Sequence, residues 1–524
     1  MASQFFRTKS ADQLIRESEE PDRQMKRTLS ALDLTALGIG AIIGAGIFSL
    51  TGTAAAGESF GTGFATPVIN YITAFLSGGA VELGRSGAGP AVTLSLIVAA
   101  LACVFAALCY AEMAAMIPVS GSAYTYSYAT LGELIAWIIG WDLILEYAVG
   151  NMAVAASWSG YFLAFLNSTL GIKLPLWLSA DFTTASRVIE RGGDALLNYS
   201  STTLPNIAGY QIAINLPAAL IVFALTVLLV YGIKESTRAN SIMVIVKVAV
   251  VVFFAAFGAF YINPTNWQPF VPNGFTGVMS GAAIIFFAFI GFDAVSTTAE
   301  ETRNPQRDLP IGMIASLAIC TVLYVMVSLV LTGLKKYTEF EGDPAALATA
   351  VGGMRWFQAL ISAGALAGTT SVLLVFQLGQ PRIFMAMARD GLLPQYFARI
   401  HQRFRTPHIT TIWTGIVVGG VAMITDIGTL ANLTNIGTLF AFILVCFGVI
   451  ALRRKAPERF RPFRVPLVPL FPIIGALLCF VLMLSLSVET WVRFFVWMAI
   501  GLLIYFLYGA HHSKLHKAEV NKAS

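Results

Sequence analysis

Residues 38–48 read GIGAIIGAGIF and lie in the middle of the first long apolar segment of this chain of 524 residues. The four glycines of this stretch make a poor helix, because each costs up to about 1 kcal/mol relative to alanine. Two structures fit the pattern. The glycines allow close packing of neighbouring membrane helices, or they mark an unwound stretch whose free N–H groups bind an anion at the start of a half-helix.

The composition of the chain favours a membrane protein. Charged residues make up 12% of the sequence and hydrophobic residues 57%, whereas a soluble domain carries about 25% charged residues. So little charge cannot cover a water-exposed globule of this length. A soluble multidomain enzyme, a disordered chain and a nucleic-acid binder are therefore excluded.

The apolar segments predict an all-α membrane protein. A helix needs about 20 mostly apolar residues to cross the hydrocarbon core of a bilayer, and twelve windows of that kind predict twelve transmembrane helices. The first 31 residues hold no apolar run that could serve as a signal peptide, so we expect the first span to direct its own insertion. The windows are 32–56, 91–116, 131–166, 212–233, 241–262, 275–298, 311–333, 356–387, 409–425, 427–452, 466–487 and 490–510.

The basic residues predict the orientation in the membrane. If the N-terminus is cytoplasmic, 24 of the 33 Lys and Arg residues lie on the inner side, eight lie outside, and Lys247 lies within a span. Short cytoplasmic loops are enriched in Lys and Arg, so both termini are expected in the cytoplasm and the protein in the cytoplasmic membrane. The net charge of +5 then needs no nucleic-acid partner.

A second glycine-interrupted segment occurs in the sixth span, where residues 286–296 read FFAFIGFDAVS. Gly291 can break the helix, and Asp293 is well placed to cap the helix that restarts, a role that we favour over ligand contact. Interrupted spans at matching positions of two halves point to an inverted-repeat transporter with a site near the middle of the membrane.

The two breaks suggest a small zwitterion as the ligand. Free N–H groups in the first break suit a carboxylate, and free carbonyl groups in the second suit an ammonium group. An α-amino acid carries both groups, and no charged side chain is needed in the site. The candidate substrate-binding residues are Ile42, Ile43, Gly44, Ala45 and Gly46 of the first break and Phe287, Ala288 and Ile290 of the second.

Lys247 is the one Lys or Arg well inside a predicted span. An unpaired ammonium there costs at least about 2.5 kcal/mol on insertion scales. Its side chain either snorkels to the inner interface or gains and loses a proton during transport. We expect Lys247 to carry or sense the coupling proton, with Glu146 of the third span nearby in the pathway.

Besides Asp293, three acidic residues of the spans are candidates for function or local structure: Asp142, Glu146 and Glu112. Asp142 and Glu146 are one helical turn apart and share a face, which either lines a polar vestibule or serves coupling. Glu112, at the inner end of the second span, is expected at the cytoplasmic gate or at an interface.

The sequence gives no sign of a metal site, a cofactor or an enzyme. The five cysteines all fall in apolar spans, where they read as small buried hydrophobic residues. The cytoplasmic loops hold no P-loop, HExxH or GxSxG motif, which argues against an ATP-driven pump or a membrane hydrolase. No cofactor is expected, and H⁺ is the expected coupling ion.

Several motifs together resemble the amino acid–polyamine–organocation superfamily, and most of all bacterial relatives of its cationic amino acid transporter family. Besides the two breaks, the resemblance includes PVSGSAYTY at 118–126, EETRNPQRDLP at 300–310 and ARDGLLP at 388–394, and it covers about residues 28–510. It implies an amino acid site between spans 1, 3, 6 and 8 and proton coupling. Lys247 matches the lysine that takes the place of a cation in sodium-coupled cousins, and Glu146 matches the family's acidic residue in span 3.

The same resemblance implies a LeuT-like inverted repeat of five plus five helices, followed by two more. The expected units are a cytoplasmic segment at 1–31, a first repeat at 32–262, a second repeat at 263–452, two further spans at 453–510 and a cytoplasmic tail at 511–524.

The chain departs from the family pattern at three places. Ala45 stands where relatives often have Thr or Ser, which leaves the backbone N–H groups to hold a carboxylate. Phe376 occupies a position in span 8 that resembles a pocket floor, and its ring would shorten the pocket unless it faces lipid or packs elsewhere. Residues 58–90 are an insertion, which forms either a short external helix with a flexible linker or a lid or partner-contact element. The long external loop 167–211 is open in role.

The leading hypothesis is a secondary active transporter that takes up small or medium neutral L-amino acids with protons by alternating access. Its partners would be the amino acid and the lipid bilayer, and the oligomeric state is open. The alternatives are a facilitator or exchanger, possibly for arginine and lysine, and a non-transporting amino acid sensor on the same scaffold.

Overall fold

The computed structural model describes residues 7–18, 27–58, 63–119, 122–192, 199–207, 209–231, 236–401 and 406–516. Some predicted features lie outside these ranges. They are parts of the two terminal segments, residues 59–62 of the insertion, Ser120 and Gly121 of the loop before the third span, and the basic residues Lys234, Arg403 and Arg405.

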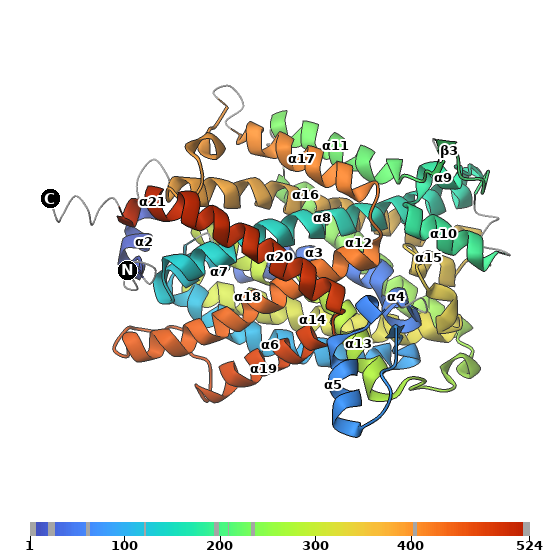
Figure 1. Ribbon diagram of the computed structural model, residues 1–524, viewed down its shortest axis with the longest axis horizontal. Helices are drawn as coiled ribbons and strands as arrows, with labels where there is room; N and C mark the ends of the chain where they lie inside the picture. The colour runs from blue at the N-terminus through green and yellow to red at the C-terminus, as the bar shows by residue number, and fades with distance from the viewer. Residues whose placement is uncertain are drawn as a thin grey trace.

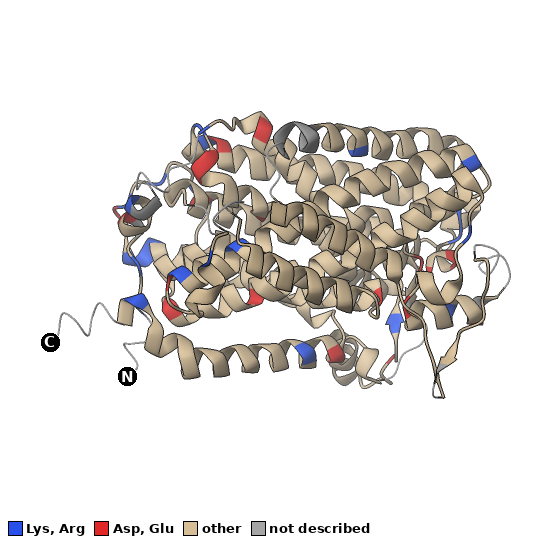
Figure 2. Ribbon diagram, turned by 90° about the horizontal axis from the view of Figure 1, so that it is seen from above, with Lys and Arg blue, Asp and Glu red and all other residues tan. Residues whose placement is uncertain are grey.

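The protein is a bundle of long helices that run along its longest axis (Figure 1). Seen at right angles to that view, Lys, Arg, Asp and Glu gather mainly toward the two ends of the bundle, and its middle is largely uncharged (Figure 2). Both termini lie at the same end of the bundle. This arrangement is that of an all-α membrane protein.

Among the described residues, eight helices are long and apolar enough to cross a membrane, or nine when the bent pair at the first predicted span is one crossing. Three further predicted spans are helical but short, namely α11 (Leu216–Tyr231), α17 (His408–Ala422) and α19 (Leu470–Leu484). The long elements are α6 (Val92–Met116), α8 (Glu133–Leu170), α12 (Ser236–Gly258), α13 (Gly274–Ile285) with its continuation, α14 (Pro305–Leu334), α16 (Arg355–Arg389), α18 (Ile427–Lys455) and α20 (Val488–Ile504). Twelve crossings therefore stay a prediction.

The remaining elements are short. The first predicted span consists of α3 (Ala31–Ile42), the π-helical turn η1 (Gly46–Leu50) and α4 (Thr51–Ala56). Two antiparallel strand pairs join β1 (Gly57–Glu58) to β2 (Arg85–Ser86) and β3 (Asn206–Ile207) to β4 (Tyr210–Gln211). Other short helices are α2 (Ala11–Ser18), α5 (Val68–Ser77), α7 (Ser122–Thr130), α9 (Leu176–Ser179), α10 (Phe182–Arg191), α15 (Ala346–Ala350) and α21 (Ala510–His512).

The centre of the bundle is formed by α8 and by the helix that begins with α13. The apolar window of α8 is almost entirely buried and that of α13 entirely so, whereas most of the window in α20 is exposed. α8 packs against α16 and α18, and α14 packs against α6 and α3. The exposed apolar surface of α20 would face lipid. The buried central helices are therefore the ones that can surround a site.

Polar side chains fix where several helices begin. Ser30 and Asp33 form a reciprocal capping box at the start of α3, Asp426 accepts the N–H groups of Gly428 and Thr429 at the start of α18, and Ser487 caps α20. Each cap satisfies backbone N–H groups that the first turn of a helix leaves without partners.

The insertion at 58–90 contains the helix that the sequence predicts, α5. Residues on either side of this helix are bonded to the bundle, and the flexibility of the predicted linker stays a prediction. The N–H of Val68 donates to the carbonyl of Leu486 (3.1 Å), and the buried Arg85 donates to Asn432 of α18. The described part of the external loop 167–211 also contains a small core, with α9 and α10 packed around Leu176 and Ala185.

Candidate functional site

The first predicted span is broken at its glycine run. α3 ends at Ile42, and Ile43 adopts an extended backbone with φ −74° and ψ 97°. After two more residues the chain resumes as η1, and the two helical parts are bent by 42°. The prediction of an unwound stretch in this span is confirmed.

The sixth predicted span is broken as well. α13 passes into a 3₁₀ turn, η7 (Phe286–Phe289), after which Ile290 is extended and Gly291 has a φ of +120°. That φ lies in a region open to glycine and disfavoured for other residues. The helix restarts as η8 (Asp293–Glu301), which confirms the predicted break.

Asp293 acts on the local backbone, but it is not the N-cap residue that we expected. Phe292 holds the cap position and makes no side-chain cap bond. The carboxylate of Asp293, the first residue of η8, accepts the N–H of Gly291 (3.2 Å). It therefore fixes the turn before the helix.

The two breaks lie in direct contact. A Cβ atom at Gly46 would overlap the Cα atom of Ala288, and one at Gly291 would come within 2.9 Å of the backbone of Ala41. Glycine at these two positions is therefore a condition of the close approach. Both breaks are buried, with Ile43 and Ala288 at 0% exposure, so the structure holds them closed to water.

The backbone groups of the breaks are partly used. The N–H of Ile43 donates to Ile39 (3.0 Å), so our expectation that it is free is wrong. No hydrogen bond from the N–H groups of Gly44 or Ala45 is found in the described part of the chain. The role of Gly44, Ala45 and Gly46 in binding a carboxylate stays a prediction.

The carbonyl groups of the second break also have partners. That of Phe287 accepts the N–H of Ile290 (3.3 Å), and that of Ala288 accepts the hydroxyl of Tyr324 (3.0 Å). The expectation of free carbonyls is therefore wrong for Phe287 and Ala288, although each oxygen keeps a second lone pair. No donor to the carbonyl of Ile290 is found among the described residues. The role of these residues in binding an ammonium stays a prediction.

Tyr324 of α14 joins the two breaks, and the sequence did not reveal it. Its buried hydroxyl lies 2.8 Å from the carbonyl oxygen of Ile42 and 3.0 Å from that of Ala288. Its one proton is shared between the last carbonyl of α3 and a carbonyl of η7. A tyrosine in an otherwise apolar segment was the available signal, because a buried hydroxyl usually has a partner.

Lys247 of α12 is fully buried, with 0% exposure. Its ammonium group donates to the carbonyls of Gly40 and Ile43, at the end of α3. The snorkelling alternative is therefore wrong. Lys247 forms no ion pair with any residue described, and its hydrogen bonds go to the first break rather than to Glu146.

Glu146 and Asp142 are buried on one face of α8, at 3% and 0% exposure. The carboxylate of Glu146 lies near Asp293 and Thr438. Neither oxygen of Asp142 has a hydrogen-bond partner among the described residues, and this side chain packs against Gly437 of α18. In this closed structure the two carboxyl groups lie between helices and do not line an open vestibule.

α16 passes along the first break and carries Phe376. The ring of Phe376 packs edge-to-face on Tyr147 of α8, with centroids 5.5 Å apart, and is 5% exposed, so the alternative that it faces lipid is wrong. Val372, one turn earlier, lies 3.0 Å from a Cβ placed at Gly44. Val372 is a neighbour of the break that sequence reasoning missed.

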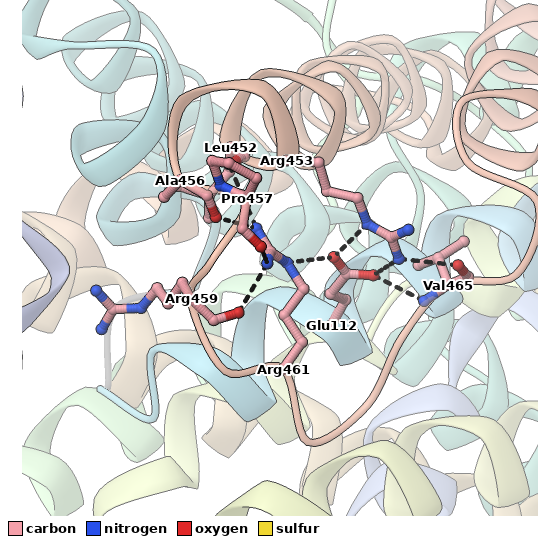
Figure 3. Close-up of polar contacts among 8 residues, drawn as sticks. All are labelled: Glu112, Leu452, Arg453, Ala456, Pro457, Arg459, Arg461 and Val465. Carbon is pink, nitrogen blue, oxygen red and sulfur yellow. Dashed lines mark hydrogen bonds and ion pairs between the residues drawn. The ribbon is translucent and has the colours of Figure 1, made fainter.

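Glu112 joins three segments near the C-terminal end of α6 (Figure 3). Its carboxylate accepts two bonds from Arg453 (3.0 and 2.6 Å) and the N–H of Val465 (2.7 Å), and pairs with Arg461 at 3.5 Å. Burial lowers the pKa of the Arg461 guanidinium, against the opposing effect of Glu112. Arg461 also donates to carbonyls at the end of α18. These contacts join α6 to α18 and to the segment that follows α18. They favour the predicted role at an interface over the role at a cytoplasmic gate.

The terminal segments close the same end of the bundle. Lys9 pairs with Asp390 after α16 (2.8 Å), and Tyr124 of α7 donates to the same carboxylate (2.7 Å). From the other terminus, Ser513 donates to Glu133 (2.5 Å). Within the described ranges, no group of three or more His, Cys, Asp or Glu residues could hold a metal ion.

Comparison with known proteins identifies the family. Residues 29–506 match the family model described as "Amino acid permease". The branched-chain amino acid permease BcaP of Bacillus subtilis is 47% identical over 519 residues, which cover 99% of this chain and 100% of that protein. The methylthioribose transporter of the same organism is 44% identical over 98% of this chain and 100% of its own length.

More distant relatives include the vacuolar cationic amino acid transporter 2 of Arabidopsis thaliana, which is 39% identical over 83% of this chain and 61% of its own length. The matches confirm the resemblance seen in the motifs, and the family and these relatives are permeases and transporters rather than enzymes. The chain therefore belongs to the amino acid permease family and is a multi-pass membrane protein.

Proposed function

We propose that this protein is a secondary active transporter that takes up a neutral amino acid with an apolar side chain of small or medium size. The observation that carries the proposal is the contact between two broken spans, with the unpaired N–H groups of Gly44 and Ala45 at the junction. Backbone N–H groups at the start of a half-helix attract a carboxylate.

Two observations favour a neutral side chain. Val372 supplies apolar surface beside the first break, and Phe376 follows one turn later on α16, against Tyr147. This apolar surface suits an aliphatic group better than a guanidinium. The relative that is 47% identical is named a branched-chain amino acid permease, and the cationic amino acid transporters are less similar. Arginine or lysine transport is the alternative.

A second candidate substrate is methylthioribose, because a transporter of that sugar is 44% identical to the chain. Methylthioribose has neither a carboxylate nor an ammonium group. The N–H groups of Gly44 and Ala45 therefore favour the amino acid.

We also propose that transport is coupled to protons through Lys247. Its ammonium group donates to two carbonyls at the end of α3. Burial without a counter-charge makes the neutral amine accessible, and loss of the proton would weaken its hold on the break. Glu146, near Asp293 of the second break, is the proposed second proton site.

The proposed architecture has twelve spans with both termini in the cytoplasm. The five-plus-five repeat would occupy 32–262 and 263–452, with two further spans at 453–510. The breaks support it, because they lie in the first and sixth predicted spans. This arrangement would allow alternating access around a site at the junction.

The test is uptake by the full-length protein in proteoliposomes. We expect leucine, valine or alanine to accumulate when the outside is acidic, and arginine and methylthioribose to compete poorly. Preferential transport of arginine or of methylthioribose would refute the substrate class. Equal accumulation with and without the pH gradient would refute proton coupling but leave the substrate class intact.

A further inference from the structure

The insertion carries an exposed apolar face that the transport site does not explain. On α5, four exposed side chains, Tyr71, Ile72, Phe75 and Leu76, lie along one stripe of the helix, with Phe75 at 87% and Leu76 at 77% exposure. The opposite face is buried through Asn70 and Ala74. From residue 63 to residue 81 the sequence holds no charged residue. A soluble surface rarely exposes such a stripe.

The position of α5 relates this face to the membrane. The segment before the helix pairs with the turn between α19 and α20: Val68 donates to Leu486, and Val488 donates to Thr66 (both 3.1 Å). That turn lies at the end of the spans farther from the two termini, and α5 runs across the direction of the bundle's long helices (Figure 1). A helix at that level and in that direction would lie parallel to the membrane surface.

The two helices that flank this turn also expose apolar side chains. α19 exposes Leu477 and Phe480, and α20 exposes Phe495 and Val496. The backbone bonds at 486–488 attach α5 to the turn that joins these two helices. The apolar surface of the spans therefore extends onto α5 at the level where the spans end.

We propose that residues 63–83 form an anchor in the membrane interface, with the stripe Tyr71, Ile72, Phe75 and Leu76 in the lipid leaflet opposite the termini. Interfacial helices bury an apolar face about 5–10 Å into the boundary between headgroups and acyl chains. Phe64 and Leu83, at 63% and 66% exposure, flank the helix and add to the same surface. Aromatic rings such as those of Tyr71 and Phe75 are common at this depth.

The anchor would hold the rest of the insertion against the bundle. Arg85 follows it in the chain, is buried, and donates to Asn432 of α18. Three residues further along α18, Asn435 donates to the carbonyls of Ala283 and Ile284, which directly precede the second break. The anchor is thus linked to α13 through two sets of hydrogen bonds, one from Arg85 to α18 and one from α18 to α13.

The experiment measures the surroundings of a probe on this face. The five native cysteines are buried, so Phe75→Cys can be labelled selectively with an environment-sensitive fluorophore in the full-length protein, reconstituted in phosphatidylcholine nanodiscs. Leu76→Cys is a second position on the same stripe, and elution as a single species shows that each variant is folded. Glu190→Cys, on an exposed position of α10, is the matched control in water.

We expect the probe at Phe75 to lose most of its emission to lipids with a doxyl group high on the acyl chain, and less to lipids with the group near the chain end. Aqueous iodide should quench it weakly, whereas the control at Glu190 should respond to iodide and ignore the doxyl lipids. Quenching by iodide equal to the control would overturn the proposal. Protection from both quenchers would also overturn it, because a protein partner or a second copy would then cover the face.

Discussion

The strongest structural prediction concerns Tyr324, whose hydroxyl joins the two broken spans. In the variant Tyr324→Phe the ring stays and only this hydroxyl is lost, so the carbonyls of Ile42 and Ala288 lose their shared donor.

 Ala288 and Ile42 are both buried, and a buried acceptor left without a donor costs about 1–3 kcal/mol. If the contact between the two breaks creates the binding site, the lost hydrogen bonds destabilise the conformation that binds the ligand.

The expected effect on affinity follows from that cost. Since 1.4 kcal/mol is a factor of ten, the Kd of leucine should rise by about 5-fold to about 150-fold. Ligand binding is weakened in proportion to the loss of the competent state. The assay is titration calorimetry of leucine on the purified protein, with thermal unfolding measured on the same samples.

Tyr505→Phe is the matched control. Tyr505 is also buried, and its hydroxyl donates to Glu133 near the termini (3.1 Å), away from the breaks. This variant should lower thermal stability and leave the Kd of leucine unchanged. If Tyr324→Phe loses stability to the same extent as the control and binds leucine with unchanged affinity, the reasoning about the breaks is refuted.

Three further changes test other parts of the account. Lys247→Ala should abolish accumulation driven by a pH gradient while exchange of leucine across the membrane persists, and undiminished accumulation would contradict its role as the proton site. Phe376→Ser should enlarge the pocket and raise arginine uptake relative to alanine uptake; unchanged selectivity would remove Phe376 from the site. Glu112→Gln leaves two arginines without their carboxylate and should lower stability by about 3 kcal/mol or less, because Arg453 is partly exposed. The exposed pair of Glu489 with Arg493 provides the control Glu489→Gln, for which thermal unfolding should change by less than about 0.5 kcal/mol.

The backbone of the site could be predicted from glycine placement. The runs around Gly44 and Gly291 are poor helices in a membrane, where unpaired backbone groups are tolerated only inside protein or a cavity, and both breaks are present. The burial of Lys247 was also one of the two predicted outcomes, because a lone ammonium within a span must either reach the interface or find acceptors.

The partners across the site could not be predicted in the same way. Tyr324 and Val372 lie in apolar runs, and which face of a long buried helix meets the breaks depends on packing between spans. The partners of Glu112 are more than 300 residues away in the chain, at Arg453 and Val465. The sequence predicted only the place of Glu112 at the end of a span, and the fold decides which residues it meets.

The number of spans shows another limit. α11, α17 and α19 are helical where the sequence predicts crossings, but they have 16, 15 and 15 residues, fewer than the roughly 20 that a perpendicular crossing needs. The hydropathy windows included flanking residues that the structure places in turns. Apolar composition therefore located these helices better than it located their ends.

The central claim is that the breaks bind an amino acid through its carboxylate and ammonium groups. The most direct measurement is thermal stabilisation of the purified protein by leucine, leucinamide and isocaproate, because a ligand raises stability by about 2.7 kcal/mol at a concentration of 100 times its Kd. Leucinamide lacks the carboxylate and isocaproate lacks the amine, so we predict that leucine stabilises the protein and that neither analogue does at the same concentration. Equal stabilisation by leucinamide would contradict the assignment of the N–H groups of Gly44 and Ala45 as the carboxylate site.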